Sequence, residues 1–214
     1  MPAAVLFDCD GVIVDSEPIL FDLLRSELAS RGLPLSRAVI ARDFVGGTMA
    51  SVAERARDLG ADLPPDWPQR FYARLYPRLA QGTPLIPGIE SVLDALDAAG
   101  IPYAVGSNGA PEKMRITLGQ HPRILARLER HLYSGQALGC PKPDPGLYLH
   151  AARALGVDPA RAVVIDDSPS GARAARRAGM LCLGYAAHDD GARLAAEGAE
   201  VFHRMADLPA HLGL

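Results

Sequence analysis

The stretch Ala3-Ala-Val-Leu-Phe-Asp-Cys-Asp-Gly11 decides the fold class. Its short apolar run stops at acidic residues and a glycine, which predicts a buried strand that ends at Asp8. Similar apolar runs recur at 101–105, 162–165, 180–183 and 200–202. Alanine-rich segments with helical spacing lie between them, at 89–99, 146–155, 170–178 and 192–197. Strands that alternate with helices predict an α/β fold with a Rossmann-like parallel sheet.

Residues 16–84 break this alternation, because they contain no convincing core strand. The apolar spacing instead predicts three amphipathic helices, near 20–28, 51–59 and 67–79. Prolines punctuate the segment at positions 64, 65, 68 and 84. We therefore predict an α/β core domain built from residues 1–15 and 85–214, with residues 16–84 inserted as an all-helical domain.

The composition restricts the classes of protein. Apolar residues make up 49% and charged residues 22% of the 214 residues, which is ordinary for a globular protein. The net charge of −3 provides no basic field, so nucleic acid is not an expected partner. The chain has no 18-residue apolar run and only three, widely spaced cysteines. We therefore expect no membrane span and a cytoplasmic location. The expected oligomeric state is a monomer or a homodimer.

Two carboxylates, Asp8 and Asp10, stand two positions apart where the first predicted strand ends. Ligands of open parallel sheets bind beyond the carboxyl ends of the strands. One carboxylate could attack phosphorus while the other transfers a proton. The alternative is an ordinary turn at the end of a strand, where Asp and Gly are common.

A second acidic pair, Asp166 and Asp167, follows the apolar run 162–165 in the same way. Adjacent carboxylates repel each other unless a cation or a basic group lies between them. Hard oxygen ligands suit Mg²⁺, which completes its coordination with water and phosphate oxygens. The alternative interpretation is a helix N-terminus, which also favours Asp.

Two further segments could complete a site at this edge. Ser107 and Asn108 follow a predicted strand and are flanked by glycines, so they could present hydrogen-bond donors to a phosphate. Lys142 lies between prolines, which restricts its reach, and its ammonium could neutralise a phosphate oxygen and keep a nucleophile ionised. Each segment alone could be an ordinary loop. Together the four segments supply the parts of a phosphoryl-transfer site.

The same four segments carry a resemblance to a known family. They are Asp8-x-Asp10-Gly-Val-Ile-Val-Asp15-Ser-Glu17, Ser107-Asn-Gly109, Lys142-Pro-Asp-Pro145 and Asp166-Asp-Ser168. They resemble the signature motifs of the haloacid dehalogenase-like hydrolase superfamily, and the resemblance covers essentially the whole chain. The inserted segment is similar to the helical cap of the subfamily that contains phosphoglycolate phosphatase, 6-phosphogluconate phosphatase and β-phosphoglucomutase.

This resemblance implies a Mg²⁺-dependent phosphatase that hydrolyses a small phosphate monoester, either a sugar phosphate or a phosphorylated small acid. It implies that Asp8 forms an aspartyl-phosphate and that Asp10 protonates the leaving group and then activates water. The implied metal ligands are Asp8, the backbone carbonyl of Asp10, Asp166 and Asp167. The implied phosphate ligands are Ser107, Asn108 and Lys142, with Lys142 also balancing charge during catalysis.

Two positions in or beside the inserted segment have two interpretations each. Glu17 could contact a substrate hydroxyl or cap a helix. Gly47, in Gly46-Gly-Thr48, could meet the substrate, or the segment could begin a helix with Thr48 as its N-cap.

The sequence leaves two alternatives to a phosphatase. A β-phosphoglucomutase-like phosphomutase is the nearest, but the segment after Asp15 lacks the histidine expected in such a hinge. A catalytically silent binding protein on the same scaffold has no sequence feature in its favour.

Overall fold

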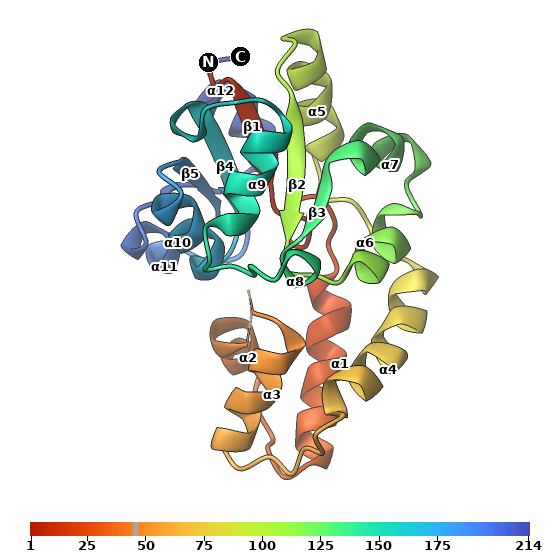
Figure 1. Cartoon of the computed structure of the whole chain (residues 1–214). Helices are drawn as coiled ribbons and strands as arrows, with labels where there is room; N and C mark the ends of the chain where they lie inside the picture. The colour runs from red at the N-terminus through yellow and green to blue at the C-terminus, as the bar shows by residue number, and fades with distance from the viewer. Residues whose placement is uncertain (45–46) are drawn as a thin grey trace.

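The computed structural model describes residues 1–44 and 47–214, which form an α/β unit joined to a helical unit (Figure 1). In these residues one parallel sheet is present, with the strand order β3-β2-β1-β4-β5-β6. The strands are β1 Ala4–Phe7, β2 Tyr103–Ser107, β3 Leu132–Ser134, β4 Ala162–Asp166, β5 Leu181–Tyr185 and β6 Glu200–Phe202. The predicted α/β class and the parallel sheet are confirmed.

Both faces of the sheet are covered by helices, which explains why its central strands are continuous apolar runs. Alternate side chains of β1 enter different clusters, because successive residues of a strand point to opposite faces. Val5 and Phe7 pack with the helices α5, Ile89–Ala98, and α12, Leu208–His211. Leu6 packs on the other face with α9 and α10, which span Gly146–Ala154 and Pro169–Arg177.

The strand register brings distant sequence segments to one edge. Phe7 pairs with Ile165, so the next residues along the two strands, Asp8 and Asp166, lie side by side. Phe7 also pairs with Val105 on the other side of β1. Because all these strands are parallel, their carboxyl ends lie at the same edge of the sheet. The remaining helices of the α/β unit are α6 Pro111–Leu118, α7 Pro122–Leu128, α8 Gly135–Leu138 and α11 Ala192–Ala196.

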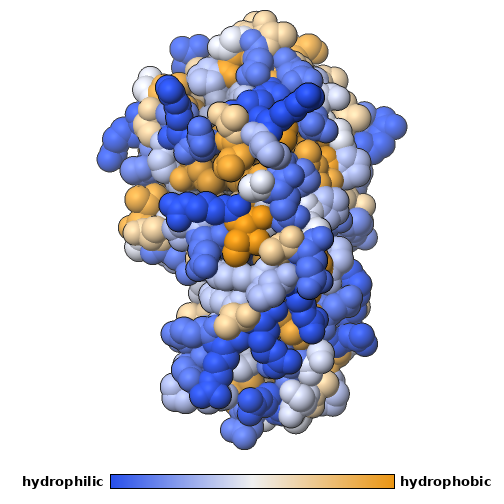
Figure 2. All heavy atoms as spheres, turned by 90° about the vertical axis from the view of Figure 1, so that its right-hand side faces the viewer, coloured by the Kyte–Doolittle hydropathy of each residue, from blue (hydrophilic) through white to orange (hydrophobic). Residues whose placement is uncertain are grey.

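The helical unit consists of α1 Glu17–Ser30, α2 Arg37–Asp43, α3 Met49–Asp58 and α4 Trp67–Gln81. It has its own apolar cluster, in which Leu28, Trp67 and Phe71 are at most 1% exposed. On the face seen in Figure 2, hydrophilic side chains cover most of this unit. Its separation as a domain with the boundaries given above stays a prediction.

The chain enters and leaves the helical unit at neighbouring points. The amide of Asp15 donates to the carbonyl of Pro84 at 2.8 Å, and the amide of Ile86 donates to the carbonyl of Ile13 at 2.9 Å. An isolated antiparallel bridge between Val14 and Leu85 lies between these bonds. The two connections therefore form a short paired ribbon.

Several elements differ from the sequence expectations. The strand β3 was not predicted, because its residues form no apolar run. The helices α2 and α7 were also not predicted, and Ile40 is the buried residue of α2. Thr48 is the N-cap of α3, since its hydroxyl accepts a bond from the Ser51 amide at 3.2 Å. Gly46 of the same segment lies outside the described residues.

Over residues 1–44 and 47–214, the helices are too short or too polar for one of them to cross a membrane.

Candidate active site

A buried lysine joins two of the predicted carboxylates. Lys142 Nζ lies 2.7 Å from Asp8 Oδ1 and 2.8 Å from Asp166 Oδ2. The side chain of Lys142 is 2% exposed and that of Asp166 is fully buried. Burial opposes the charge of the ammonium, yet Asp166 and Asp8 hold the pKa of Lys142 above its ordinary value. The structure thus brings these three residues together, as the sequence motifs predicted.

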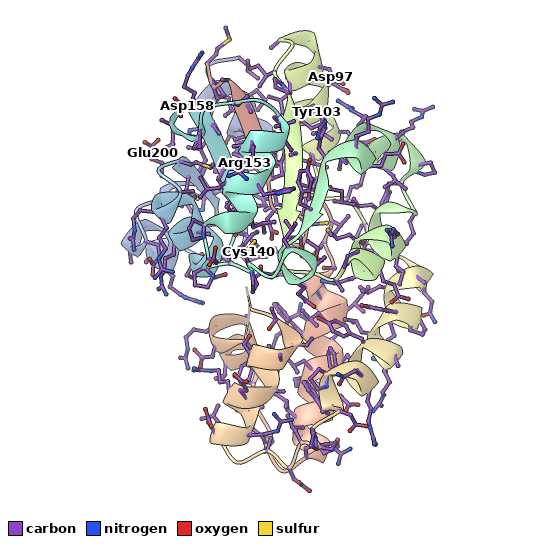
Figure 3. All side chains as sticks on the ribbon, viewed as in Figure 1. Asp97, Tyr103, Cys140, Arg153, Asp158 and Glu200 are labelled. Carbon is purple, nitrogen blue, oxygen red and sulfur yellow. The ribbon has the colours of Figure 1, made fainter. Side chains whose placement is uncertain are left out.

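The backbone of Lys142 is held by the side chain of Asn108. The Lys142 amide donates to Asn108 Oδ1 at 2.7 Å, and Asn108 Nδ2 donates to the Lys142 carbonyl at 3.1 Å. Gln136 Nε2 donates to the carbonyl of Asn108 at 2.7 Å. Figure 3 places Cys140, from the same segment, at the edge of the α/β unit that faces the helical unit. Asn108 therefore positions the lysine loop, in addition to its predicted role as a phosphate ligand.

Donors from Tyr148 and Ser168 hold the carboxylate of Asp166 in place. The hydroxyl of Tyr148 donates to Asp166 Oδ2 at 2.5 Å, and the amide and hydroxyl of Ser168 donate to Asp166 Oδ1 at 2.9 and 2.7 Å. The Ser168 hydroxyl also accepts a bond from the Gly171 amide and so caps α10. The helix N-terminus is therefore present, with Ser168 as its cap, while metal binding by the aspartate pair stays a prediction.

Three carboxylates form a group that suits a hard cation. One oxygen each from Asp8, Asp166 and Asp167 lies within 4.8 Å of the others. Burial, followed by the charges of Glu17 and Asp8, raises the pKa of Asp167 well above its ordinary value. One ammonium cannot balance three buried carboxylates, so ionising all of them requires a further cation. This donor set of carboxylate oxygens fits Mg²⁺.

Asp10 occupies a separate, cationic environment. Lys113 Nζ lies 2.7 Å from Asp10 Oδ1, and the Ser16 hydroxyl donates to the same oxygen at 2.5 Å. The Ser107 hydroxyl lies 3.5 Å from Asp10 Oδ2. Burial alone would raise the pKa of Asp10, but Lys113 and Ser16 lower it below its ordinary value.

Lys113 is a residue of the site to which the sequence motifs assign no role. It belongs to α6 and is 7% exposed, so its ammonium is buried with its partner. A signal for it exists in the composition: Lys113 and Lys142 are the lysines among the 22 basic residues of the chain. Both lysines of the sequence thus reach the same site.

A cavity lies between this edge of the sheet and the helical unit. Asp8, Asp10, Lys113 and Lys142 line it from the α/β side. The helical side contributes Glu17, Gly47 and Tyr72, together with apolar side chains from α1, α3 and α4. The two predicted substrate residues, Glu17 and Gly47, therefore line the cavity, while their contact with a substrate stays a prediction.

The cavity poses an electrostatic problem for an anionic substrate. Burial raises the pKa of Asp8 to about 7, although Lys142 opposes this shift. Burial, together with Asp10 and Asp15, raises the pKa of Glu17 to about 7. A bound cation would favour the charged form of Asp8 and attract phosphate oxygens. The arrangement can therefore support nucleophilic attack by a carboxylate on a phosphoryl group.

Residues 2–179 match the family described as haloacid dehalogenase-like hydrolase. The chain belongs to this family. It is 32% identical over 201 residues to a phosphoglycolate phosphatase of Xylella fastidiosa, covering 88% of this chain and 84% of that protein. It is 28% identical over 207 residues to the 6-phosphogluconate phosphatase of Escherichia coli, covering 96% and 92%.

A solved structure from Deinococcus radiodurans, described as a HAD family hydrolase with bound phosphate and sodium, is similar in fold. It superposes with a TM-score of 0.77 and 36% identity, covering 99% of this chain and 95% of that one. The relatives differ in length: this chain spans 66% of a CBBY-like protein of Arabidopsis thaliana but 92% of the Escherichia coli phosphatase. The predicted family is confirmed: this haloacid dehalogenase-like protein is an enzyme with phosphatases among its relatives.

Proposed function

We propose that this haloacid dehalogenase-like hydrolase is a Mg²⁺-dependent phosphatase of small phosphate monoesters that works through an aspartyl-phosphate on Asp8. The observation that carries the proposal is the convergence of Asp8, Lys142 and the pair Asp166-Asp167 at one sheet edge. These groups come from the ends of β1 and β4 and from the loop before α9, and three unrelated segments have no reason to gather four charges in one place.

The first half-reaction transfers the phosphoryl group to the enzyme. A carboxylate oxygen of Asp8 attacks phosphorus while the bond to the leaving oxygen breaks. Asp10 is ionised in the free protein, so it takes up a proton from solvent as the anionic substrate binds and passes it to that leaving oxygen, so that an alcohol departs. Lys142 offsets the negative charge of Asp8 as the anionic substrate approaches. Ser107 and Asn108, which line the same cavity, hold the phosphoryl oxygens.

The second half-reaction returns the enzyme to its starting state. Asp10 takes a proton from a water molecule, and the resulting hydroxide oxygen forms a bond to phosphorus. The bond between Asp8 and phosphorus breaks, releasing inorganic phosphate. Asp10 then releases this proton to solvent, which restores the free protein.

Asp8, Asp166, Asp167 and the backbone carbonyl of Asp10 would hold the Mg²⁺. When bound, the cation supplies charge neutralisation between the carboxylates and the phosphate. The protein prepares for this by fixing Asp166 with Tyr148 and Ser168, so that the carboxylate group does not reorient when its charge changes.

We also propose that residues 16–84 act as a cap over the core formed by residues 1–15 and 85–214. The cavity lies between these two parts, and Gln136 Nε2 reaches the hydroxyl of Tyr72 in α4 at 3.4 Å. A cap in this place would exclude water during the first half-reaction and select the organic part of the substrate. A sugar phosphate or a phosphorylated small acid is the expected substrate class.

The decisive experiment tests for a covalent phosphoenzyme. Wild-type protein is mixed with p-nitrophenyl phosphate and Mg²⁺, quenched in acid and digested for mass spectrometry. We expect one added phosphoryl group on the peptide that contains Asp8, and none in Asp8→Asn or after chelation of Mg²⁺. Full turnover by Asp8→Asn would overturn the covalent mechanism. Asp58→Asn is a matched control, because Asp58 is exposed at the end of α3 and does not line the cavity, so turnover should stay intact.

A further inference from the structure

The environment of Asp10 contains more than a charge partner. Lys113 and Ser16 both bind Oδ1 of Asp10, at 2.7 and 2.5 Å. Asp10 Oδ2 faces the loop after β2 instead: the Ser107 hydroxyl lies 3.5 Å away, and a Cβ added to Gly109 would lie 3.4 Å away. The two carboxylate oxygens are thus distinguished: Oδ1 accepts two short bonds, whereas Oδ2 accepts one long bond from Ser107, which belongs to the loop proposed to bind phosphate.

The position of Lys113 in its helix is unfavourable by local criteria. It is in the first turn of α6, which begins at Pro111. The helix dipole disfavours a cation there, and burial disfavours any ammonium. Asp10 compensates for both effects, since its carboxylate lies 2.7 Å from the ammonium of Lys113. A residue that conflicts with its local structure points to a requirement of the site.

We propose that Lys113 is a positioning residue that orients Asp10 so that its Oδ2 transfers the proton to the leaving oxygen. This inference rests on the function proposed above. Rotation of the carboxyl group out of its present plane would break the bonds to Lys113 and Ser16. Lys113 therefore fixes the direction of proton transfer without contacting phosphorus, and the proton leaves from Oδ2 as the bond from phosphorus to the leaving oxygen breaks.

Dependence on the leaving group tests this inference. An alkyl phosphate needs a proton on its leaving oxygen, whereas p-nitrophenolate is stable enough to leave without one. The measured quantity is kcat/KM, because it reports only the steps up to the aspartyl-phosphate. Lys113→Met should lower kcat/KM for an alkyl phosphate about 10- to 100-fold, which is less than the full contribution of a general acid because Asp10 itself remains. The loss for p-nitrophenyl phosphate should be less than about threefold.

Matched variants separate positioning from a structural role. Arg115→Met removes an exposed charge from the same helix and should leave both substrates unchanged. Ser16→Ala removes the other donor to Asp10 Oδ1 and should show the same selective loss as Lys113→Met. In an Asp10→Asn background, adding Lys113→Met should lower the alkyl activity by less than about twofold, because the two residues act as one unit.

The outcomes are distinguishable. An equal loss for both substrates in Lys113→Met and Ser16→Ala, or a full further loss in the Asp10→Asn background, would overturn the positioning role. Selective loss with non-additivity supports it. Failure of the proposed phosphatase function would appear separately, as wild-type protein that releases no phosphate from p-nitrophenyl phosphate with Mg²⁺. Circular dichroism and thermal melting of every variant confirm that the compared proteins are folded.

Discussion

A Cβ atom added to Gly11 would lie 1.9 Å from Oδ2 of Asp167. Gly11 also has a φ of +77°, a conformation that other residues rarely adopt. The first motif therefore approaches the fourth so closely that a hydrogen atom is the one side chain that fits between them. The position of the Asp167 carboxylate depends on this contact.

We expect Gly11→Ala to displace Asp167 and weaken Mg²⁺ binding. The activity should fall at least about 100-fold, since misplacing a charged group of an active site carries a cost of that order. Gly179→Ala is the control, because Gly179 has a φ of +73° but no atom within 4 Å of the added Cβ. The measurements are kcat/KM as a function of Mg²⁺ concentration and thermal melting. Similar losses of activity in both variants would attribute the effect to backbone strain.

Asn108→Ala should slow catalysis more than it weakens phosphate binding. It removes both bonds to the Lys142 backbone, so the ammonium loses its fixed distance from Asp8. We expect kcat to fall about 10- to 100-fold, typical of a misplaced catalytic group, with KM and inhibition by inorganic phosphate changed less than about threefold. Steady-state kinetics with phosphate as a product inhibitor measure both. A large rise in the inhibition constant with kcat preserved would instead make Asn108 chiefly a phosphate ligand.

The metal-free enzyme should lose stability as the pH rises from about 4 to 8. Asp8 and Glu17 have pKa values of about 7 when folded, against ordinary values of 3.8 and 4.5. In this window the folded state binds more protons than the unfolded chain, so the free energy of unfolding decreases with increasing pH. Thermal melting in a chelator should show the decline. Asp8→Asn should reduce it, because that side chain no longer titrates.

Mg²⁺ supplies the complementary test of the same electrostatics. At pH 8 it should raise the melting temperature of the wild type, since it binds the folded carboxylate group. The rise should shrink at pH 5, where Asp8 is protonated, and it should be smaller in Asp8→Asn at both pH values. An increase that is independent of pH in the wild type would contradict a site that includes Asp8.

Tyr148→Phe should destabilise the fold and slow turnover moderately. The Tyr148 hydroxyl is a fully buried donor to Asp166, and its loss removes a bond to a charged group, at a cost of about 1.5–3 kcal/mol. Tyr103→Phe is the control, because the Tyr103 hydroxyl donates to Asp97 at 2.9 Å on the surface. Figure 3 shows Tyr103 and Asp97 near one end of the sheet. Urea unfolding of the two variants provides the comparison. A larger loss in Tyr103→Phe would contradict a role for burial.

The sequence predicts the part of the site that depends on parallel strands. Asp8 and Asp166 come directly after or at the end of apolar runs, so the common edge of a parallel sheet brings them together. The restricted segment around Lys142 could be assigned to the same site because only a cation would balance those carboxylates. Such predictions depend on chain order and charge, both of which a sequence displays directly.

Contacts made by helix faces were not predicted. Lys113 reaches Asp10, and Tyr148 reaches Asp166, only because α6 and α9 present these side chains toward the sheet edge. Which side of a short helix faces a particular carboxylate depends on loop geometry and packing, which periodicity does not specify. The strand β3 was missed for a related reason, since its pairing with β2 stabilises a segment that has no apolar run of its own.

The paired ribbon formed by Val14 and Leu85 has a consequence for engineering and for descent. The two ends of the helical segment lie side by side where they leave the α/β unit. A short linker between residues 14 and 85 could therefore replace the entire segment without stretching the backbone. An exchange of whole inserts at this junction would alter which molecules are admitted while the acidic residues at the strand ends keep their places. Proteins of this architecture can therefore change their substrates by exchanging the helical segment, without any change to the reactive groups.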